Sequence, residues 1–261
     1  KNNKSKSKKM ADAEAVTVEF RGKQVPVTVA RALNAEDVQK AVNSFTFKTW
    51  LAKFAQPSNN NLDLQSIELQ SVDMFGPRVG FLKFKAAVLN EEGKFVPGIV
   101  FMRGGSVCVL VVLECEGELF SIATVQARIP VGDSNLHEIP AGMIDGSDNF
   151  AGVAATELKE ECELEIKVSD LIDLTEFAYG KGAEGVYPSA GGCDEFIRCF
   201  AYEAKITREK LNEFQGRLTG LRSHGEAISL KVVPFGNLWR ECPDVKTLSA
   251  LYLYDQYKKS A

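Results

Sequence analysis

Residues 142–164 carry the most information about the fold and read GMIDGSDNFAGVAATELKEECEL. The later part of this stretch predicts a helix over 149–163. A short polar run precedes it, in which Ser147 or Asp148 is the expected N-cap, because short polar side chains accept the first free backbone N–H groups of a helix.

Three acidic residues of this helix, Glu157, Glu160 and Glu161, lie at positions i, i+3 and i+4. Their Cβ atoms are therefore expected about 5–6 Å apart on one helical face. Carboxylates this close repel each other unless water or a cation lies among them, and oxygen ligands suit Mg²⁺ or Mn²⁺. The loop before the helix offers the backbone carbonyl of Ala141 as a further ligand. An ordinary solvated acidic face is the alternative for the three glutamates alone.

The surrounding residues resemble the Nudix box, in which a glycine is followed at fixed spacing by Arg-Glu-U-x-Glu-Glu-x-Gly-U, with U aliphatic. The matching positions are Gly142, Glu157, Leu158, Glu160, Glu161 and Leu164. Asp148, Thr156 and Glu163 replace a glutamate, the arginine and the second glycine of the box. In the family this arginine braces the acidic helix by an ion pair, and Glu163 implies a different exit from the helix.

The resemblance implies a fold class of α/β (α+β): a Nudix α/β/α sandwich with a mixed β-sheet, plus a smaller β-rich N-terminal domain. It also implies Mg²⁺ as the cofactor, with Mn²⁺ as the alternative. The metal ligands would be Ala141, Glu157, Glu160 and Glu161.

Three flanking segments are similar to ADP-sugar and ADP-ribose diphosphatases. Residues 138–142, Glu-Ile-Pro-Ala-Gly, look like the entry to their Nudix box, and 126–128, Gln-Ala-Arg, resemble a strand end whose arginine binds the diphosphate. Residues 187–195 resemble their Pro-Ser-Pro-Gly loop, with Ala190 in place of the second proline. The substrate-binding residues implied are Arg128, Glu138 and Glu195.

The catalytic residues implied by the resemblance are Glu160 and Glu226. In related diphosphatases a glutamate of a late loop activates water, and Glu226 lies in the matching loop of this chain. An ordinary solvated loop acid is the alternative for Glu226.

The similarity spans about residues 95–255 and is closest to plant-type ADP-sugar diphosphatases. The expected reaction is hydrolysis of the diphosphate bond of ADP-glucose or ADP-ribose to AMP and a sugar phosphate. A UDP-sugar diphosphatase is one alternative. The departures at Thr156 and Glu163 motivate another, a Nudix module that binds a nucleotide without cleaving it.

The sequence does not support two other functional motifs. Residues 180–185 fit Gly-x-Gly-x-x-Gly, but they run into Val-Tyr-Pro rather than opening a helix, as a dinucleotide-binding fingerprint must. No Gly-x-Ser-x-Gly elbow of a serine hydrolase occurs.

Composition excludes several partner classes. The 261 residues carry a formal net charge of −4, which disfavours binding to nucleic acid or to an anionic membrane. The longest apolar run, 107–113, is far shorter than the roughly 18 residues of a membrane-spanning helix. Six cysteines without a Cys-x-x-Cys pair indicate reduced thiols rather than a zinc site.

The expected domains are a disordered tail over 1–14, a β-rich dimerisation domain over 15–100 and the Nudix hydrolase domain over 101–261. In related diphosphatases the N-terminal segment pairs two subunits, so a homodimer is expected. The aromatic residues of the N-terminal domain suit either such an interface or a plain core; they are Phe45, Phe47, Trp50 and Phe54.

Local patterns predict the elements within these domains. A hairpin turning at Arg21-Gly22 is expected near the start, followed by a helical stripe that Asn34 caps and that breaks near Ser44. Residues 107–114 and 119–128 read as strands, as do 176–179 and 195–204, and a helix is expected over 245–258.

The first ten residues, KNNKSKSKKM, hold five lysines and no acid. Such a start is typical of the remnant of an organelle transit peptide, and also of a plain disordered tail. Together with the plant-like resemblance it favours a plastid location, with the cytoplasm as the alternative.

Overall fold

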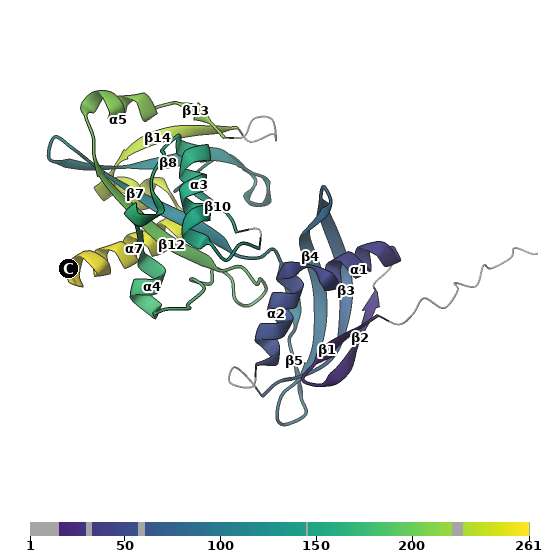
Figure 1. Ribbon diagram of the computed structural model, residues 1–261. Helices are drawn as coiled ribbons and strands as arrows, with labels where there is room; N and C mark the ends of the chain where they lie inside the picture. The colour runs from purple at the N-terminus through teal and green to yellow at the C-terminus, as the bar shows by residue number, and fades with distance from the viewer. Residues whose placement is uncertain (1–15, 30–32, 57–60, 145, 221–226, 261) are drawn as a thin grey trace, which may run out of the picture. The chain divides into compact units, whose positions relative to one another are not determined.

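The computed structural model describes residues 16–29, 33–56, 61–144, 146–220 and 227–260 (Figure 1). These residues form two compact units. One comprises the chain up to Arg103 together with Gly191–Asp194, and the other comprises Gly104–Ala190 and Glu195–Ala261.

The N-terminal unit is a β-sheet with two helices packed on it. The strands follow the order β1-β2-β3-β4-β5, with β6 also paired to β4. The elements are β1 (Thr17–Phe20), β2 (Lys23–Val29), α1 (Ala35–Asn43), α2 (Phe45–Ala55), β3 (Asp63–Phe75), β4 (Arg78–Leu89), β5 (Phe95–Val96) and β6 (Ile99–Met102). Strands β2 and β3 run parallel, so the helical segment between them forms the crossover.

Predicted turns and caps of this unit are confirmed. Arg21 and Gly22 both have positive φ, as the tight turn of a two-residue hairpin needs. Asn34 accepts the Asp37 N–H at the start of α1, and Ser44 ends α1 and caps α2.

Three of the four aromatic residues considered for an interface pack into this unit's core. Phe47 is fully buried, and Trp50 and Phe54 pack against the same apolar cluster, while Phe45 is exposed. The core interpretation therefore holds for Phe47, Trp50 and Phe54.

The C-terminal unit is built on an eight-stranded mixed sheet of order β11-β12-β7-β8-β14-β13, with β10 beside β7 and β9 beside β8. Its strands are β7 (Ser106–Cys115), β8 (Glu118–Arg128), β9 (Asp133–Glu138), β10 (Ala141–Met143), β11 (Leu171–Asp173), β12 (Ile197–Lys205), β13 (Leu218–Thr219) and β14 (Ile228–Pro234). Its helices are α3 (Phe150–Cys162), α4 (Leu174–Tyr179), α5 (Arg208–Phe214), α6 (Leu238–Glu241) and α7 (Val245–Ser260), with short 3-10 turns at Ile129–Val131, Val168–Asp170 and Phe235–Asn237.

The central strand β7 is buried on both faces, as its continuous apolar run predicts. Alternate residues point to opposite sides: Val109 packs with Leu158 of α3, and Leu110 packs with Leu253 of α7. Helices therefore cover both faces of the sheet (Figure 1), and the predicted α/β/α sandwich with a mixed sheet is confirmed.

Two local predictions need correction. The N-cap of α3 is Asn149, whose side chain accepts the Gly152 N–H. Ser147 does not cap the helix because its hydroxyl accepts the Asn149 N–H instead. Residues 176–179 belong to helix α4 rather than to a strand, and Asp173 caps this helix by accepting the Glu176 N–H.

Within the described part of the chain, none of the helices combines the length and the apolar character needed to cross a membrane.

Candidate active site

The acidic face of α3 brings two carboxylates against the start of β10. Glu161 is buried, and its Oε2 accepts the Ala141 N–H at 2.9 Å. Burial, and then the neighbouring Glu157 carboxylate, raise the pKa of Glu161 to about 8, although the Ala141 N–H and Arg128 act in the opposite direction. A buried carboxylate beside another one disfavours the charged state. A cation among them would remove that penalty.

Gly142 is needed for this arrangement. A Cβ added there would lie 1.8 Å from Oε1 of Glu157. The Glu157 carboxylate therefore occupies the space that any other residue at position 142 would fill. The clash with Glu157 explains why the first position of the Nudix-like motif is a glycine.

The donor set suits a hard divalent cation, because it consists of carboxylate oxygens and a backbone carbonyl. Glu157, Glu160 and Glu161 share α3, and Ala141 lies beside Glu161. These side chains do not converge on a common position. Among the described residues, no group of three or more His, Cys, Asp or Glu is arranged to hold a metal ion. Binding would therefore draw the carboxylates together.

A chain of ion pairs lies within electrostatic range of Glu161. Arg128, at the end of β8, donates through Nε to Oε2 of Glu138 at 2.6 Å. Lys246, in the first turn of α7, donates to Oε1 of Glu138 at 2.6 Å and to Oδ1 of Asp244 at 2.9 Å. The sequence predicts Arg128 and Glu138 as site residues, and the structure joins them directly.

Lys246 carries no signal in the local sequence, since it meets Glu138 from more than one hundred residues away. Burial acts to lower its pKa, but the Asp244 and Glu138 carboxylates outweigh that effect and the pKa is raised. Lys246 is therefore charged at neutral pH.

The C-terminal end of α3 is held by the segment around β13. The Thr219 hydroxyl donates to the Glu161 carbonyl at 2.5 Å, and the Gly220 N–H donates to the Glu160 carbonyl at 3.3 Å. Arg217 forms an ion pair with Glu163. Glu163 adopts a positive φ of 53°, the conformation that the family's glycine adopts readily.

These contacts stabilise α3 in a chain that lacks the arginine of the motif. Thr156, which takes its place, is exposed and bonds only to the Gly152 carbonyl of its own helix in the described structure. Bracing of α3 therefore comes from Arg217, Thr219 and Gly220.

Two further predicted site residues are Glu195 and Glu226. Glu195 lies just before β12, and the hydroxyl of Ser106, the first residue of β7, donates to its Oε1 at 3.3 Å. Glu226 falls outside the described residues.

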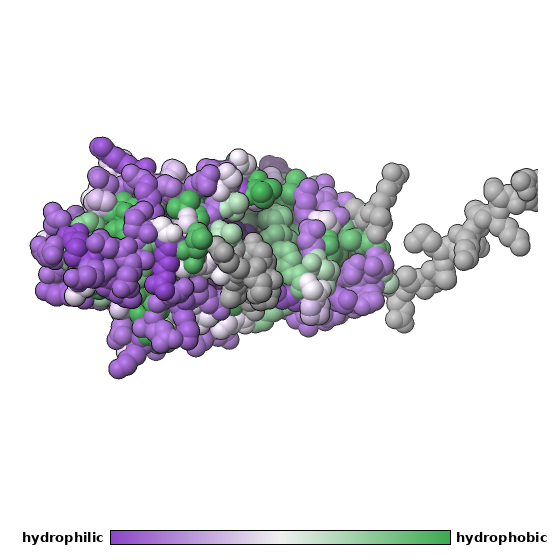
Figure 2. All heavy atoms as spheres, turned by 90° about the horizontal axis from the view of Figure 1, so that it is seen from above, coloured by the Kyte–Doolittle hydropathy of each residue, from purple (hydrophilic) through white to green (hydrophobic). Residues whose placement is uncertain are grey.

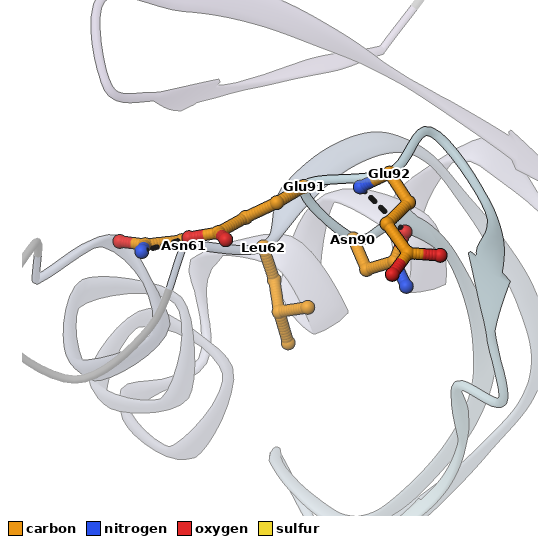
Figure 3. A pocket seen from close by; sticks show the side chains of 5 residues that line it. All are labelled: Asn61, Leu62, Asn90, Glu91 and Glu92. Atoms are coloured by element: carbon orange, nitrogen blue, oxygen red, sulfur yellow. Dashed lines mark hydrogen bonds between the residues drawn. The ribbon is translucent and has the colours of Figure 1, made fainter.

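A small surface hollow belongs to the N-terminal unit (Figure 3). It lies between the start of β3 and the β4–β5 turn, and the residues lining it are Asn61, Leu62, Asn90, Glu91 and Glu92. Asn61 donates a hydrogen bond to Glu91, and Asn90 accepts the Glu92 N–H, so these side chains stabilise the loop ends. None of the predicted site residues lines this hollow.

Comparison with known proteins decides the family. Over 241 residues the chain is 39% identical to Nudix hydrolase 14, chloroplastic, of Arabidopsis thaliana; the match covers 90% of this chain and 78% of that protein. The chain belongs to the Nudix hydrolase family. No family model matches it.

The fold of this Nudix hydrolase also has a solved counterpart. A structure described as an ADP compounds hydrolase aligns with a TM-score of 0.50 at 14% identity, covering 78% of this chain and 98% of the other. At this identity the likeness concerns the fold alone. The resemblance predicted from residues 142–164 is therefore confirmed at the level of family and fold.

Proposed function

We propose that this Nudix hydrolase cleaves the diphosphate bond of ADP-sugars, such as ADP-glucose and ADP-ribose, to give AMP and a sugar phosphate. The observation that carries the proposal is the buried carboxylate of Glu161, held beside Glu157 and within electrostatic range of Arg128. A substrate diphosphate would meet both an acidic metal-binding face and a guanidinium.

The residues that would hold Mg²⁺, or Mn²⁺, are Glu157, Glu160, Glu161 and the Ala141 carbonyl. A bound divalent cation supplies charge neutralisation at the diphosphate and acidifies a water molecule. Glu161 is held ready by the Ala141 N–H, which fixes one of its oxygens. We assign the proton-accepting role to Glu226, with Glu160 as a catalytic residue of the acidic face.

Arg128 is proposed to bind the diphosphate, and Glu138 to orient Arg128. Only Nε of the guanidinium has a hydrogen-bond acceptor among the described residues. The two terminal nitrogens are thus available for phosphate oxygens, which a guanidinium binds in a forked geometry. We assign Glu195 a substrate contact near the start of β7.

One experiment distinguishes this function from two alternatives, a UDP-sugar diphosphatase and a nucleotide-binding module. The wild-type chain is incubated with ADP-ribose, ADP-glucose and UDP-glucose, and kcat/KM is measured from AMP or UMP release. The proposal expects the ADP compounds to be preferred. Preference for UDP-glucose would favour a UDP-sugar diphosphatase. Tight binding without hydrolysis of any of the three would favour a nucleotide-binding module.

We propose a homodimer formed through the N-terminal unit, which contains the dimerisation domain predicted over 15–100. The face of its sheet that lies opposite α1 and α2 keeps apolar side chains open to solvent. Ile99 is 60% and Phe101 is 41% exposed, and the Phe101 ring packs on Phe81 of the same face. Figure 2 shows apolar areas on an otherwise mostly hydrophilic surface.

Light scattering tests the dimer. The wild-type chain is expected at twice the mass of one chain. Phe101→Glu, which places a charge on this face, is expected to shift the population towards the monomer. A wild-type monomer at micromolar concentration would refute the proposal.

A plastid location is proposed, with the cytoplasm as the alternative. Its support is the relative that is named chloroplastic. Import of the protein into isolated chloroplasts tests it, and exclusion from the organelle would favour the cytoplasm.

A further inference from the structure

The ion pairs around Glu138 contain a residue to which the proposed reaction assigns no role. Glu138 is buried, and each of its carboxylate oxygens bonds to a different cation: Oε2 to Arg128 and Oε1 to Lys246, both at 2.6 Å. Its backbone carbonyl is held as well, because the Thr124 hydroxyl donates to it at 3.3 Å. The rotation of the carboxylate is therefore set by the two cations.

Lys246 is itself held firmly by the start of α7. Asp244 accepts the N–H and the hydroxyl of Thr247 with Oδ2, and accepts Lys246 Nζ with Oδ1. The side chain of Lys246 is only 14% exposed. A long, flexible lysine that is buried between two carboxylates acts as a fixed donor rather than as a mobile surface charge.

This arrangement limits how Glu138 meets Arg128. A guanidinium and a carboxylate left to themselves favour a bidentate pair, which uses two nitrogens and both oxygens. Here Lys246 occupies Oε1, so Glu138 engages only Nε of Arg128. Among the described residues the two terminal nitrogens of the guanidinium have no acceptor, and they remain for a ligand.

We propose that Lys246 is a positioning residue for diphosphate binding. By holding Oε1 of Glu138, it prevents the bidentate Arg128–Glu138 pair and keeps the forked end of Arg128 open to the diphosphate. The inference rests on the proposed function, because it takes Arg128 as the group that contacts the diphosphate.

The test uses Lys246→Met and a ligand that cannot be hydrolysed, α,β-methylene-ADP. Its Kd is measured by calorimetry in Mg²⁺, beside KM and kcat for ADP-ribose. Loss of one charge-assisted hydrogen bond predicts that Kd and KM rise about 10- to 100-fold, with kcat changed less than about threefold. Lys246→Arg, which keeps a charged donor, is expected to restore most of the binding.

The same lysine substitution made in the Glu138→Gln variant separates a positioning role of Lys246 from a merely structural one. In Glu138→Gln the neutral amide no longer competes as a carboxylate for Arg128. Adding Lys246→Met to this variant is expected to leave Kd unchanged within about twofold. Lys258→Met is the matched control, because Lys258 lies on the same helix and pairs with Glu203 on the protein surface.

Each outcome decides the inference. An unchanged Kd in Lys246→Met, or an equal rise with and without Glu138→Gln, overturns it. If Lys246→Met does not fold, Lys246→Gln takes its place, and failure of both to fold marks a structural lysine and overturns the inference. If wild type binds α,β-methylene-ADP but hydrolyses no nucleotide sugar, the proposed function fails while the Kd comparison still tests Lys246; absence of wild-type binding overturns both.

Discussion

Replacing Gly142 with alanine is expected to cost activity without costing stability. The added Cβ would lie 1.8 Å from Oε1 of Glu157, whereas ordinary contact begins at about 3.4 Å. The carboxylate must therefore retreat by about 1.6 Å, the difference between these two distances. Because the obstructing atom is the end of a flexible side chain, the backbone of β10 need not move.

A displacement of this size is large on the scale of a catalytic site, where about 1 Å of misplacement costs up to about 100-fold in rate. We expect Gly142→Ala to lower kcat/KM for ADP-ribose about 10- to 100-fold and to raise the Mg²⁺ concentration needed for half-maximal activity. The free energy of unfolding is expected to stay within about 1 kcal/mol of wild type, since alanine also restricts the unfolded chain.

Two further variants sharpen this assay. Gly236→Ala is the matched control, because a Cβ there meets no atom within 4 Å. Glu157→Asp shortens the obstructing side chain, so Gly142→Ala should cost less activity in that background than in wild type. Unchanged activity and Mg²⁺ dependence in Gly142→Ala, or loss of activity together with the fold, would refute the reasoning.

Three other predictions concern acidic residues. In EDTA, Glu161 has a pKa of about 8 in the folded protein and about 4.5 in the unfolded chain, so its contribution to stability is complete below pH 4.5 and is lost as the pH rises through 8. In urea titrations between these two pH values, the free energy of unfolding of Glu161→Gln should therefore rise relative to that of wild type, by at most about 1.4 kcal/mol per pH unit. Glu163→Gly relieves a positive φ but loses the ion pair to Arg217, so the unfolding free energy should change by less than about 1 kcal/mol and activity should persist in a steady-state assay; a loss of several kcal/mol would contradict this. Glu226→Gln should lower kcat by a factor of about 10²–10⁴ in the same assay if it accepts the proton, and a normal kcat would exclude that role.

Local sequence patterns anticipated much of the fold where short-range physics decides it. The positive-φ turn at Arg21-Gly22 and the Asn34 cap depend on residues within four positions of each other. The helix expected over 149–163 forms over Phe150–Cys162, because its apolar and acidic positions follow a helical period. The motif spacing around Glu157 and Glu161 identified the family.

Local sequence patterns did not predict elements that are very short or contacts between residues far apart in the chain. Residues 176–179 are too few to distinguish a period of 2 from a period of 3.6, and the capping Asp173 decides for a helix. Three consecutive short polar residues, Ser147, Asp148 and Asn149, could each cap α3, and the cap is Asn149. Lys246 could not be predicted at all, because its role depends on Glu138, which is remote in the chain.

We propose that the carboxylates of α3, of which Glu161 is buried, serve metal-dependent cleavage of a diphosphate bond. The most direct measurement is product analysis from ADP-ribose with Mg²⁺, with EDTA, and with Glu161→Gln in Mg²⁺. AMP and ribose phosphate are expected with wild type in Mg²⁺, and almost none in EDTA or with a folded Glu161→Gln. Equal AMP release by Glu161→Gln, or release that persists in EDTA, would contradict it.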